Sequence, residues 1–369
     1  MPENKKLPEL IKKDSQRSSI ALVVANLVIL GSIGYWYYFA INCAFASSWV
    51  QAIFWFASGT FMLWLFASHI ATNCIELFIN TTRLDRDSAR IDAVMSATLK
   101  ILGALRIQKS ISIASLLVRL GQARLYQGFF DSAEGLFKES VEIAERIHGR
   151  QGSIIVAMYR LNLSSAYSWQ KKYLESEFET ERALEMLQRF DTPLSKDYQA
   201  YCNLSLGISR VWLEDLNGAE PYLKSALDKF EQTKPSYALP LISISQAKIS
   251  CCLYLALLNL RQEKMEKLYE YINKFLELTE GDSSIIAVTH TRALNHLADE
   301  FTRRQDFTRA EDLLNMAYAI GSDRPFHPDS QETLATFETL LIATDRQAEV
   351  ADMRSWLRPL NENTKPLIG

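Results

Sequence analysis

Residues 116–140 read LLVRLGQARLYQGFFDSAEGLFKES, two apolar patterns separated by a glycine-containing break. In each pattern apolar residues recur every three or four positions, the spacing that places side chains on one face of a helix. Gly121 follows Leu120 directly, and Ala133 precedes Phe137 by about one helical turn. Small residues let two helices approach closely, and the large residues fill the layer between them. The stretch therefore predicts a hairpin of two helices.

The same pattern recurs along the chain at a nearly constant interval. A leucine followed by a small residue occurs at Leu120-Gly121, Leu163-Ser164, Leu206-Gly207, Leu255-Ala256 and Leu297-Ala298. The intervals are 43, 43, 49 and 42 residues, and the long one contains an extra segment with two prolines. A fixed period is typical of repeat proteins, because one hairpin alone leaves an apolar face that its neighbour must cover.

This pattern resembles the tetratricopeptide repeat (TPR) family, whose unit is two antiparallel helices with the motifs W-x2-L-G-x2-Y and A-x3-F. The period near 42 is similar to that of kinesin-light-chain-type repeats, as are the stretches Asn295-His296-Leu297-Ala298 and His327-Pro328-Asp329. The resemblance assigns packing positions to Leu120, Gly121, Ala133, Phe137, Leu163, Tyr167, Leu206, Gly207, Ala219, Leu255, Ala256, Leu297, Ala298, Phe301 and Ala310. It implies an all-α fold in which residues 110–357 form an α-solenoid, a right-handed superhelix of five to six TPR-like helical hairpins.

Several positions depart from the family pattern. The consensus Trp position holds Arg160 in the second copy, and the consensus Tyr position holds Arg124 in the first copy and Arg210 in the third. Ser176 and Thr180 stand where the second copy should carry Ala and Phe. Each copy is therefore weak by itself, and the prediction rests on five copies in register.

The N-terminal part has a different character. Residues 18–75 contain no Asp, Glu, Lys or Arg, although 22% of the whole chain is charged. A membrane-spanning helix needs roughly 20 apolar residues. We therefore expect a transmembrane helical hairpin with spans near Ile20–Tyr38 and Trp49–Ala71. Positive flanks remain cytoplasmic, and residues 1–17 form a basic tail. This predicts an integral membrane protein of the cell or inner membrane, with both termini and the repeats in the cytoplasm.

The remaining segments are assigned from their charge and apolar spacing. Residues 76–109 are charged but amphipathic, with Ile91, Met95 and Leu102 at helical spacing. They predict a linker or capping helix that covers the first repeat. A dimerising helix is the alternative, which leaves a homo-oligomer open. Residues 358–369 hold two prolines and predict a C-terminal tail.

The chain carries no recognisable motif for catalysis or metal binding. It lacks the P-loop, GxGxxG, HExxH, GxSxG and CxxC patterns. His290 and His296 are six residues apart, so they point to different faces of a helix and form no metal pair. Adjacent Cys251 and Cys252 in an apolar helix are typical of small core residues. The net charge of -3 does not favour nucleic acid as a partner. We therefore expect no enzyme activity, no cofactor, no metal and no nucleic-acid binding.

The resemblance also places an inner groove. In the family, positions 2, 5, 9, 12 and 13 of the first helix line this groove. Position 13 here is aromatic in the first three copies and basic in the next two, and two further polar residues lie in the fifth copy. The predicted partner-binding residues are Tyr126, Trp169, Trp212, Arg261, Arg292, Asp299 and Arg303. Aromatic and arginine side chains are frequent interface anchors. The alternative is that these rings pack between adjacent repeats.

The sequence thus predicts a membrane-anchored, non-catalytic scaffold that binds a protein or peptide partner in its groove and contacts the bilayer through residues 18–75. The partner segment is expected to carry apolar anchors and some acidic character. One alternative is an assembly or secretion accessory whose repeats lie on the periplasmic or lumenal side. Another is an enzyme or transport component that works through His69, which lies in the uncharged stretch.

Overall fold

The computed structural model of the chain describes residues 35, 37–38, 40–42, 50–51, 53–60, 84–104, 110–149, 152–232, 243–280, 288–321 and 327–350. From residue 84 onward the described part is built of helices joined by turns. These helices are α3 (Leu84–Ala104), α4 (Ile111–Tyr126), α5 (Phe130–His148), α6 (Ile154–Trp169), α7 (Tyr173–Leu187), α8 (Pro193–Trp212), α9 (Leu216–Gln232), α10 (Ile244–Arg261), α11 (Met265–Thr279), α12 (Val288–Arg303), α13 (Phe307–Gly321) and α14 (Pro328–Ala343).

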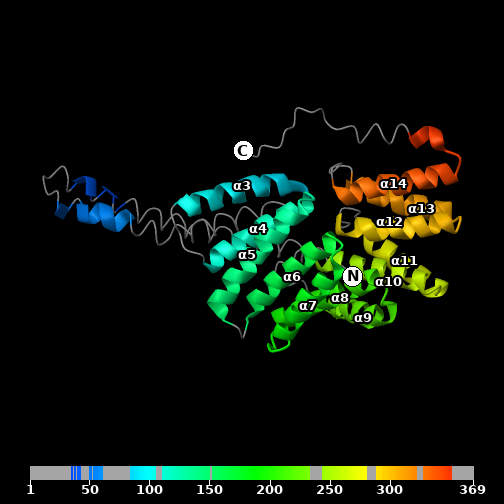
Figure 1. Cartoon of the computed structure of the whole chain (residues 1–369), viewed down its shortest axis with the longest axis horizontal. Coiled ribbons are helices and arrows are strands. Elements are labelled where there is room, and N and C mark those ends of the chain that lie inside the picture. The colour runs from blue at the N-terminus through cyan, green and yellow to red at the C-terminus, as the bar shows by residue number, and fades with distance from the viewer. Residues whose placement is uncertain are drawn as a thin grey trace, which may run out of the picture.

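Successive helices pair into hairpins that stack side by side (Figure 1). The pairs are α4 with α5, α6 with α7, α8 with α9, α10 with α11, and α12 with α13. Helix α14 opens a sixth unit and packs against α12 and α13. The predicted all-α array of stacked helical hairpins is therefore confirmed.

The first four hairpins begin in the same way and all five turn in the same way, because the sequence repeats the same local signals. A Ser or Thr caps α4, α6, α8 and α10 by accepting a hydrogen bond from a backbone N–H of the first turn. The turn inside each hairpin holds one residue with positive φ. These residues are Gly128, Lys171, Glu214, Glu263 and Gln305. They recur at intervals of 43, 43, 49 and 42 residues, so the period of the structure is the period of the sequence.

The two helices of a hairpin approach closely at small residues. A Cβ atom added to Gly121 would lie 2.6 Å from Phe137 Cε1, and one added to Gly207 would lie 2.5 Å from Leu223 Cγ. At such a distance a Cβ atom would force the facing side chain to shift. The residues assigned to packing are buried, except Tyr167, which is half-buried.

Hydroxyl groups fill this layer in the second hairpin. Ser164 occupies the glycine position, and its Oγ lies 2.6 Å from Thr180 Oγ1 and 3.0 Å from Ser176 Oγ. Ser205 of α8 joins them, with its Oγ 3.1 Å from Ser164 Oγ. Buried hydroxyls need hydrogen-bond partners, and here they satisfy one another. The polar departures from the family pattern are therefore compatible with close helix packing.

Helix α3 covers the end of the array at the first hairpin. Ile91 and Met95 are 1% and 0% exposed and pack with Leu120 of α4. Arg124, at the consensus Tyr position, forms an ion pair with α3, since its Nε lies 2.7 Å from Asp92 Oδ2. Both contacts shield the terminal apolar face, which a repeat array must cover to remain soluble.

Most of the predicted membrane hairpin, both predicted tails and His69 lie outside the described residues. In the pieces that are described, the ring centroids of Tyr37 and Phe56 are 5.3 Å apart, and Tyr37 Oη lies 3.1 Å from Thr60 Oγ1. Val50 is 82% exposed there. Among the residues that the structure describes, no helix has both the length and the apolar character needed to cross a bilayer.

Candidate functional site

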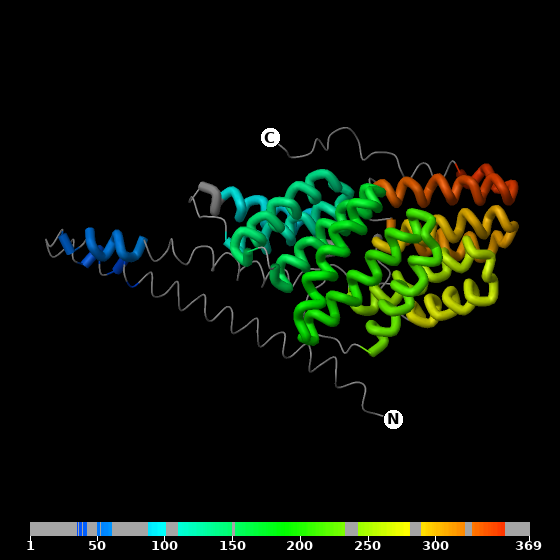
Figure 2. The backbone as a smooth tube through the Cα atoms, turned by 60° about the horizontal axis from the view of Figure 1, so that its bottom comes forward, coloured from blue at the N-terminus to red at the C-terminus, as the bar shows by residue number. Residues whose placement is uncertain are grey.

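The array curves until its last described unit meets its first two. Figure 2 shows the start of α14 (orange) beside the green helices. The ring of His327 packs edge-on against Trp169 at the end of α6 and Phe130 at the start of α5, with centroids 5.2 and 5.7 Å away. Pro328 lies so close to Gly128 that a Cβ there would be 3.1 Å from Pro328 Cδ. We call the contact of α12 and α14 with the first two hairpins the seam.

One buried arginine of α12 contacts both α14 and the end of α6 at the seam. Arg292 is 7% exposed, and its Nη2 lies 3.1 Å from Oδ1 of Asp329, which is 2% exposed. The guanidinium also donates to the backbone carbonyls of Ser168 and Trp169, at 3.0 and 3.2 Å. The last carbonyls of a helix lack partners within it and carry its negative dipole end. Arg292 therefore caps α6 although it lies 124 residues from Ser168 in the sequence.

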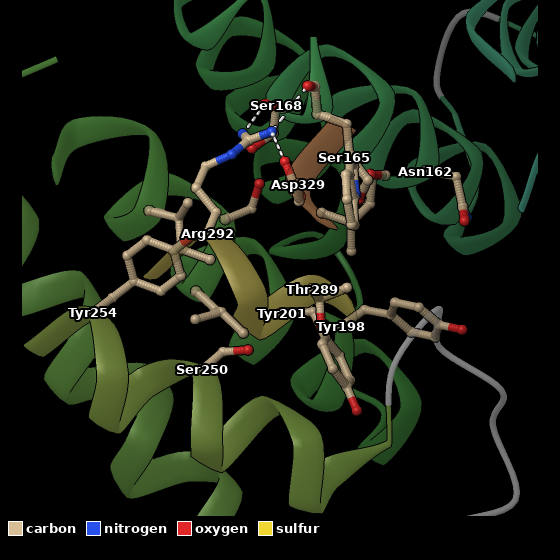
Figure 3. A pocket seen from close by; sticks show the side chains of 15 residues that line it. Asn162, Ser165, Ser168, Tyr198, Tyr201, Ser250, Tyr254, Thr289, Arg292 and Asp329 are labelled. Atoms are coloured by element: carbon tan, nitrogen blue, oxygen red, sulfur yellow. Dashed lines mark hydrogen bonds and ion pairs between the residues drawn. The ribbon is translucent and has the colours of Figure 1, made fainter. Parts of the chain in front are cut away.

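The inner face of the array lines a partly open cavity of about 130 Å³ (Figure 3). Its walls come from the first helices α6, α8, α10 and α12 and from the start of α14. The apolar lining residues are Leu161, Trp169, Leu204 and Ile208. The polar lining residues are Asn162, Ser165, Ser168, Tyr198, Tyr201, Ser205, Ser250, Tyr254, Thr289, Arg292 and Asp329. Four consecutive hairpins thus contribute to one site.

The cavity lining combines apolar and polar side chains and carries no net charge. Its charged side chains are Arg292 and Asp329, which pair with each other. Burial raises the pKa of Tyr198 and of Tyr254 to about 12, so both hydroxyls are protonated at neutral pH. Tyr198 is 3% exposed, and its hydroxyl has no hydrogen-bond partner among the described residues. A buried polar group without a partner is uncommon in folded proteins.

Aromatic and basic side chains surround Trp212 beside the cavity. The Tyr173 ring stacks on the Trp212 ring, with centroids 5.9 Å apart and 16° between the planes, and the His296 ring is 4.6 Å away. The Arg261 guanidinium lies 5.2 Å from the Trp212 ring centroid. Burial and the nearby arginines lower the pKa of His296 to about 4. His296 is therefore uncharged at neutral pH and adds no charge beside the cavity.

The predicted groove residues do not all meet at this cavity. Trp169 and Arg292 line it, and Trp212 adjoins it through Tyr254, whose ring centroid is 6.0 Å from that of Trp212. Tyr126 is 4% exposed. Trp169 lines the cavity and also packs against Phe130 of the neighbouring hairpin and His327 at the start of α14, and its role in partner binding stays a prediction.

The other predicted residues lie away from the cavity. Arg261 covers Trp212 and donates to the carbonyl of Val211 at 2.7 Å. Asp299 and Arg303 pair with each other at 2.6 Å, and the Arg303 side chain is 69% exposed. In the described part of the chain, no group of three or more His, Cys, Asp and Glu side chains could hold a metal ion.

Sequence reasoning missed most of the cavity lining. In the family register, Ser165 occupies position 9 and Tyr201 occupies position 2 of their helices, so a complete list of groove positions would include them. Tyr198 and Asp329 carry no such signal. They reach the cavity because of how the helices are placed in the curved array, which the motif does not encode.

Comparison with known proteins supports the repeat assignment. Residues 112–189 match the tetratricopeptide repeat family model. No curated protein matches the chain in sequence.

The solved structures that resemble the chain include the following three. One is a Rap protein complexed with competence and sporulation factor, with 10% identity, 90% of this chain and 92% of that chain covered, and a TM-score of 0.54. Another is the apo form of RapI, with 12% identity, coverage of 79% and 98%, and a TM-score of 0.53. BtubC (BKLC) from P. vanneervenii is 18% identical, with coverage of 67% and 94% and a TM-score of 0.43. At such identities the likeness concerns the fold.

Proposed function

We propose that this tetratricopeptide repeat array binds a peptide segment of a partner protein on its inner face, without catalysis, and that residues 18–75 hold the array at a membrane. The observation that carries the binding role is the cavity, because first helices from four consecutive hairpins line it. Aromatic side chains such as Trp169 are frequent anchors of interfaces. The Rap protein of the same fold is complexed with competence and sporulation factor, and by analogy of fold alone a binding role suits this array.

Filling the cavity is expected to abolish peptide binding. Ser165 lines the cavity, and the ring introduced by Ser165→Phe would occupy the space that we assign to the ligand. Full-length protein in mild detergent would be selected against a library of short random peptides, and the most enriched peptide measured by fluorescence anisotropy. We expect Ser165→Phe to weaken its binding by at least about tenfold.

The matched control is Ser132→Phe, the same exchange at an exposed position of α5 away from the cavity. We expect the control to bind the peptide with wild-type affinity. Wild-type affinity in a folded Ser165→Phe protein would place the peptide elsewhere and contradict the proposal.

The membrane role is supported by the uncharged sequence and by the pieces of it that are described. Ile53, Phe54 and Phe56 are 67%, 62% and 59% exposed. Large apolar side chains are seldom left in contact with water over a contiguous patch, and such patches mark protein or membrane contacts. The ring contact of Tyr37 with Phe56 suits two helical segments that lie side by side.

Thiol labelling tests the orientation. Cys202, Cys251 and Cys252 are buried, so they are protected in the folded array. Cys43 falls between the two predicted spans, in the turn that cytoplasmic termini would place outside. Ser132→Cys would add an exposed thiol on α5. In intact cells we expect a membrane-impermeant maleimide to label Cys43 but not Ser132→Cys, and permeabilised cells to be labelled at both. Labelling of Ser132→Cys in intact cells would favour the periplasmic or lumenal alternative.

A further inference from the structure

We propose that the segment held in the cavity is electrically neutral, that it inserts one apolar side chain, and that the Tyr198 hydroxyl hydrogen-bonds its main chain. This inference rests on the proposed function and names the class of peptide that the site accepts. A neutral segment replaces the partly acidic partner segment that the sequence predicts for a groove with arginines.

The charges of the cavity are already neutralised. Arg292 lies 3.1 Å from Asp329 and also donates to the carbonyls of Ser168 and Trp169. An acidic ligand group would have to displace these partners, and a basic one would have to compete for Asp329. A charge moved from water into a buried site without a free counter-charge is strongly disfavoured. The site therefore selects against charged side chains.

The size and the apolar walls of the cavity suit one side chain. An apolar cavity of about 150 Å³ holds a benzene molecule, so a cavity of about 130 Å³ has room for one branched aliphatic or small aromatic group. Leu161, Leu204 and Ile208 supply the apolar contact. The rest of the segment then lies along the inner face outside the cavity.

The Tyr198 hydroxyl supplies a hydrogen-bonding group that the free protein does not use. Tyr198 lines the cavity and is 3% exposed, and no described residue bonds to its hydroxyl. The hydroxyl oxygen itself exposes almost no surface, so the Tyr198 ring must turn toward the cavity when a segment binds. A main-chain carbonyl or amide of that segment would then satisfy the hydroxyl, which removes the penalty of leaving it unpaired. Tyr159 offers the contrast, because its hydroxyl is already bonded to Ser115 Oγ at 2.7 Å.

The test uses full-length protein in mild detergent and a library of short peptides. The terminal charges of the peptides are removed by capping, and each position of the library samples neutral, acidic and basic residues. We expect neutral peptides to be enriched. The best of them should bind with a Kd that changes by less than about twofold between low and high NaCl concentration, because salt screens charge interactions alone. Placing Asp or Lys at its apolar anchor position should weaken binding by at least about tenfold.

Two variants examine the hydroxyl. Tyr198→Phe is expected to weaken binding of the best peptide by about fivefold while stability is unchanged or higher, because no bond within the described protein is lost. Tyr159→Phe should lower stability and leave the affinity unchanged. Enrichment of charged peptides, a strong salt dependence or an unchanged affinity in Tyr198→Phe would overturn this inference and leave peptide binding intact. If no peptide binds, the proposed function itself fails.

Discussion

Replacing Arg292 with methionine is expected to lower the free energy of unfolding of the repeat array by about 3–5 kcal/mol. The change leaves Asp329, which is 2% exposed, without its counter-charge. It also removes the donor that the guanidinium provides to the carbonyls of Ser168 and Trp169. Because methionine keeps much of the side-chain volume, the decrease in the free energy of unfolding arises mainly from the lost ion pair and hydrogen bonds. Urea unfolding followed by far-ultraviolet circular dichroism measures it.

The double variant Arg292→Met with Asp329→Asn separates the two causes. Because it removes the unpaired charge, we expect it to recover about half of the lost free energy. A loss below about 1 kcal/mol in the single variant would resemble that of an exposed ion pair. That result would mean that the seam does not form in solution.

Replacing Arg160 with methionine is expected to lower the free energy of unfolding by about 3 kcal/mol. Arg160 is 3% exposed and forms ion pairs with Glu179 of α7 and Glu145 of α5. The Glu179 side chain is 12% exposed, so its carboxylate would keep little solvent after Arg160 is removed. The Glu145 side chain is 39% exposed and can be hydrated instead, which makes the expected loss smaller than for Arg292→Met.

Arg189→Met is the matched control for this change. Arg189 pairs with Glu185 at 2.8 Å, but the two side chains are 50% and 70% exposed. Exposed pairs of this kind contribute little to stability, so we expect no measurable change in urea unfolding. Equal decreases in the free energy of unfolding of the Arg160 and Arg189 variants would show that burial of an ion pair does not determine its contribution to stability.

The hairpins follow from local physics, and for this reason the sequence predicts them. A leucine with a small neighbour recurs at 43, 43, 49 and 42 residues, and the left-handed turn residues recur at the same intervals. Close approach at Gly121 and Gly207 needs only the residue and its nearest helix. Contacts of this kind are encoded within one repeat, so the pattern locates them.

The charged departures from the family pattern could not be explained from the sequence. Arg124, Arg160 and Arg210 each occupy a consensus aromatic position, and each pairs with a carboxylate on a neighbouring helix. The partners are Asp92, Glu179 and Glu177. Which of many surface carboxylates becomes the partner depends on the packing of two helices. A single sequence does not give that geometry.

The contacts of the seam and the lining of the cavity are still harder to predict from the sequence. A repeat period fixes where helices begin and end, but the small rotation between neighbouring repeats accumulates along the array. That accumulated rotation brings Arg292 to the end of α6 and His327 to Trp169. The family register indicated Trp169 and Arg292 as inner-face residues, whereas the pairing with Asp329 needed the structure.

Photo-crosslinking of a bound peptide tests most directly whether the cavity is the binding site. The peptide selected from the library would carry a benzophenone at its apolar anchor, and the adducts on the full-length protein would be mapped by mass spectrometry. We expect adducts on α6 and α8, near the lining residues Leu161, Ser165 and Leu204. Adducts confined to the second helices α5, α7 and α9 would place the peptide on the outer face and contradict binding in the cavity.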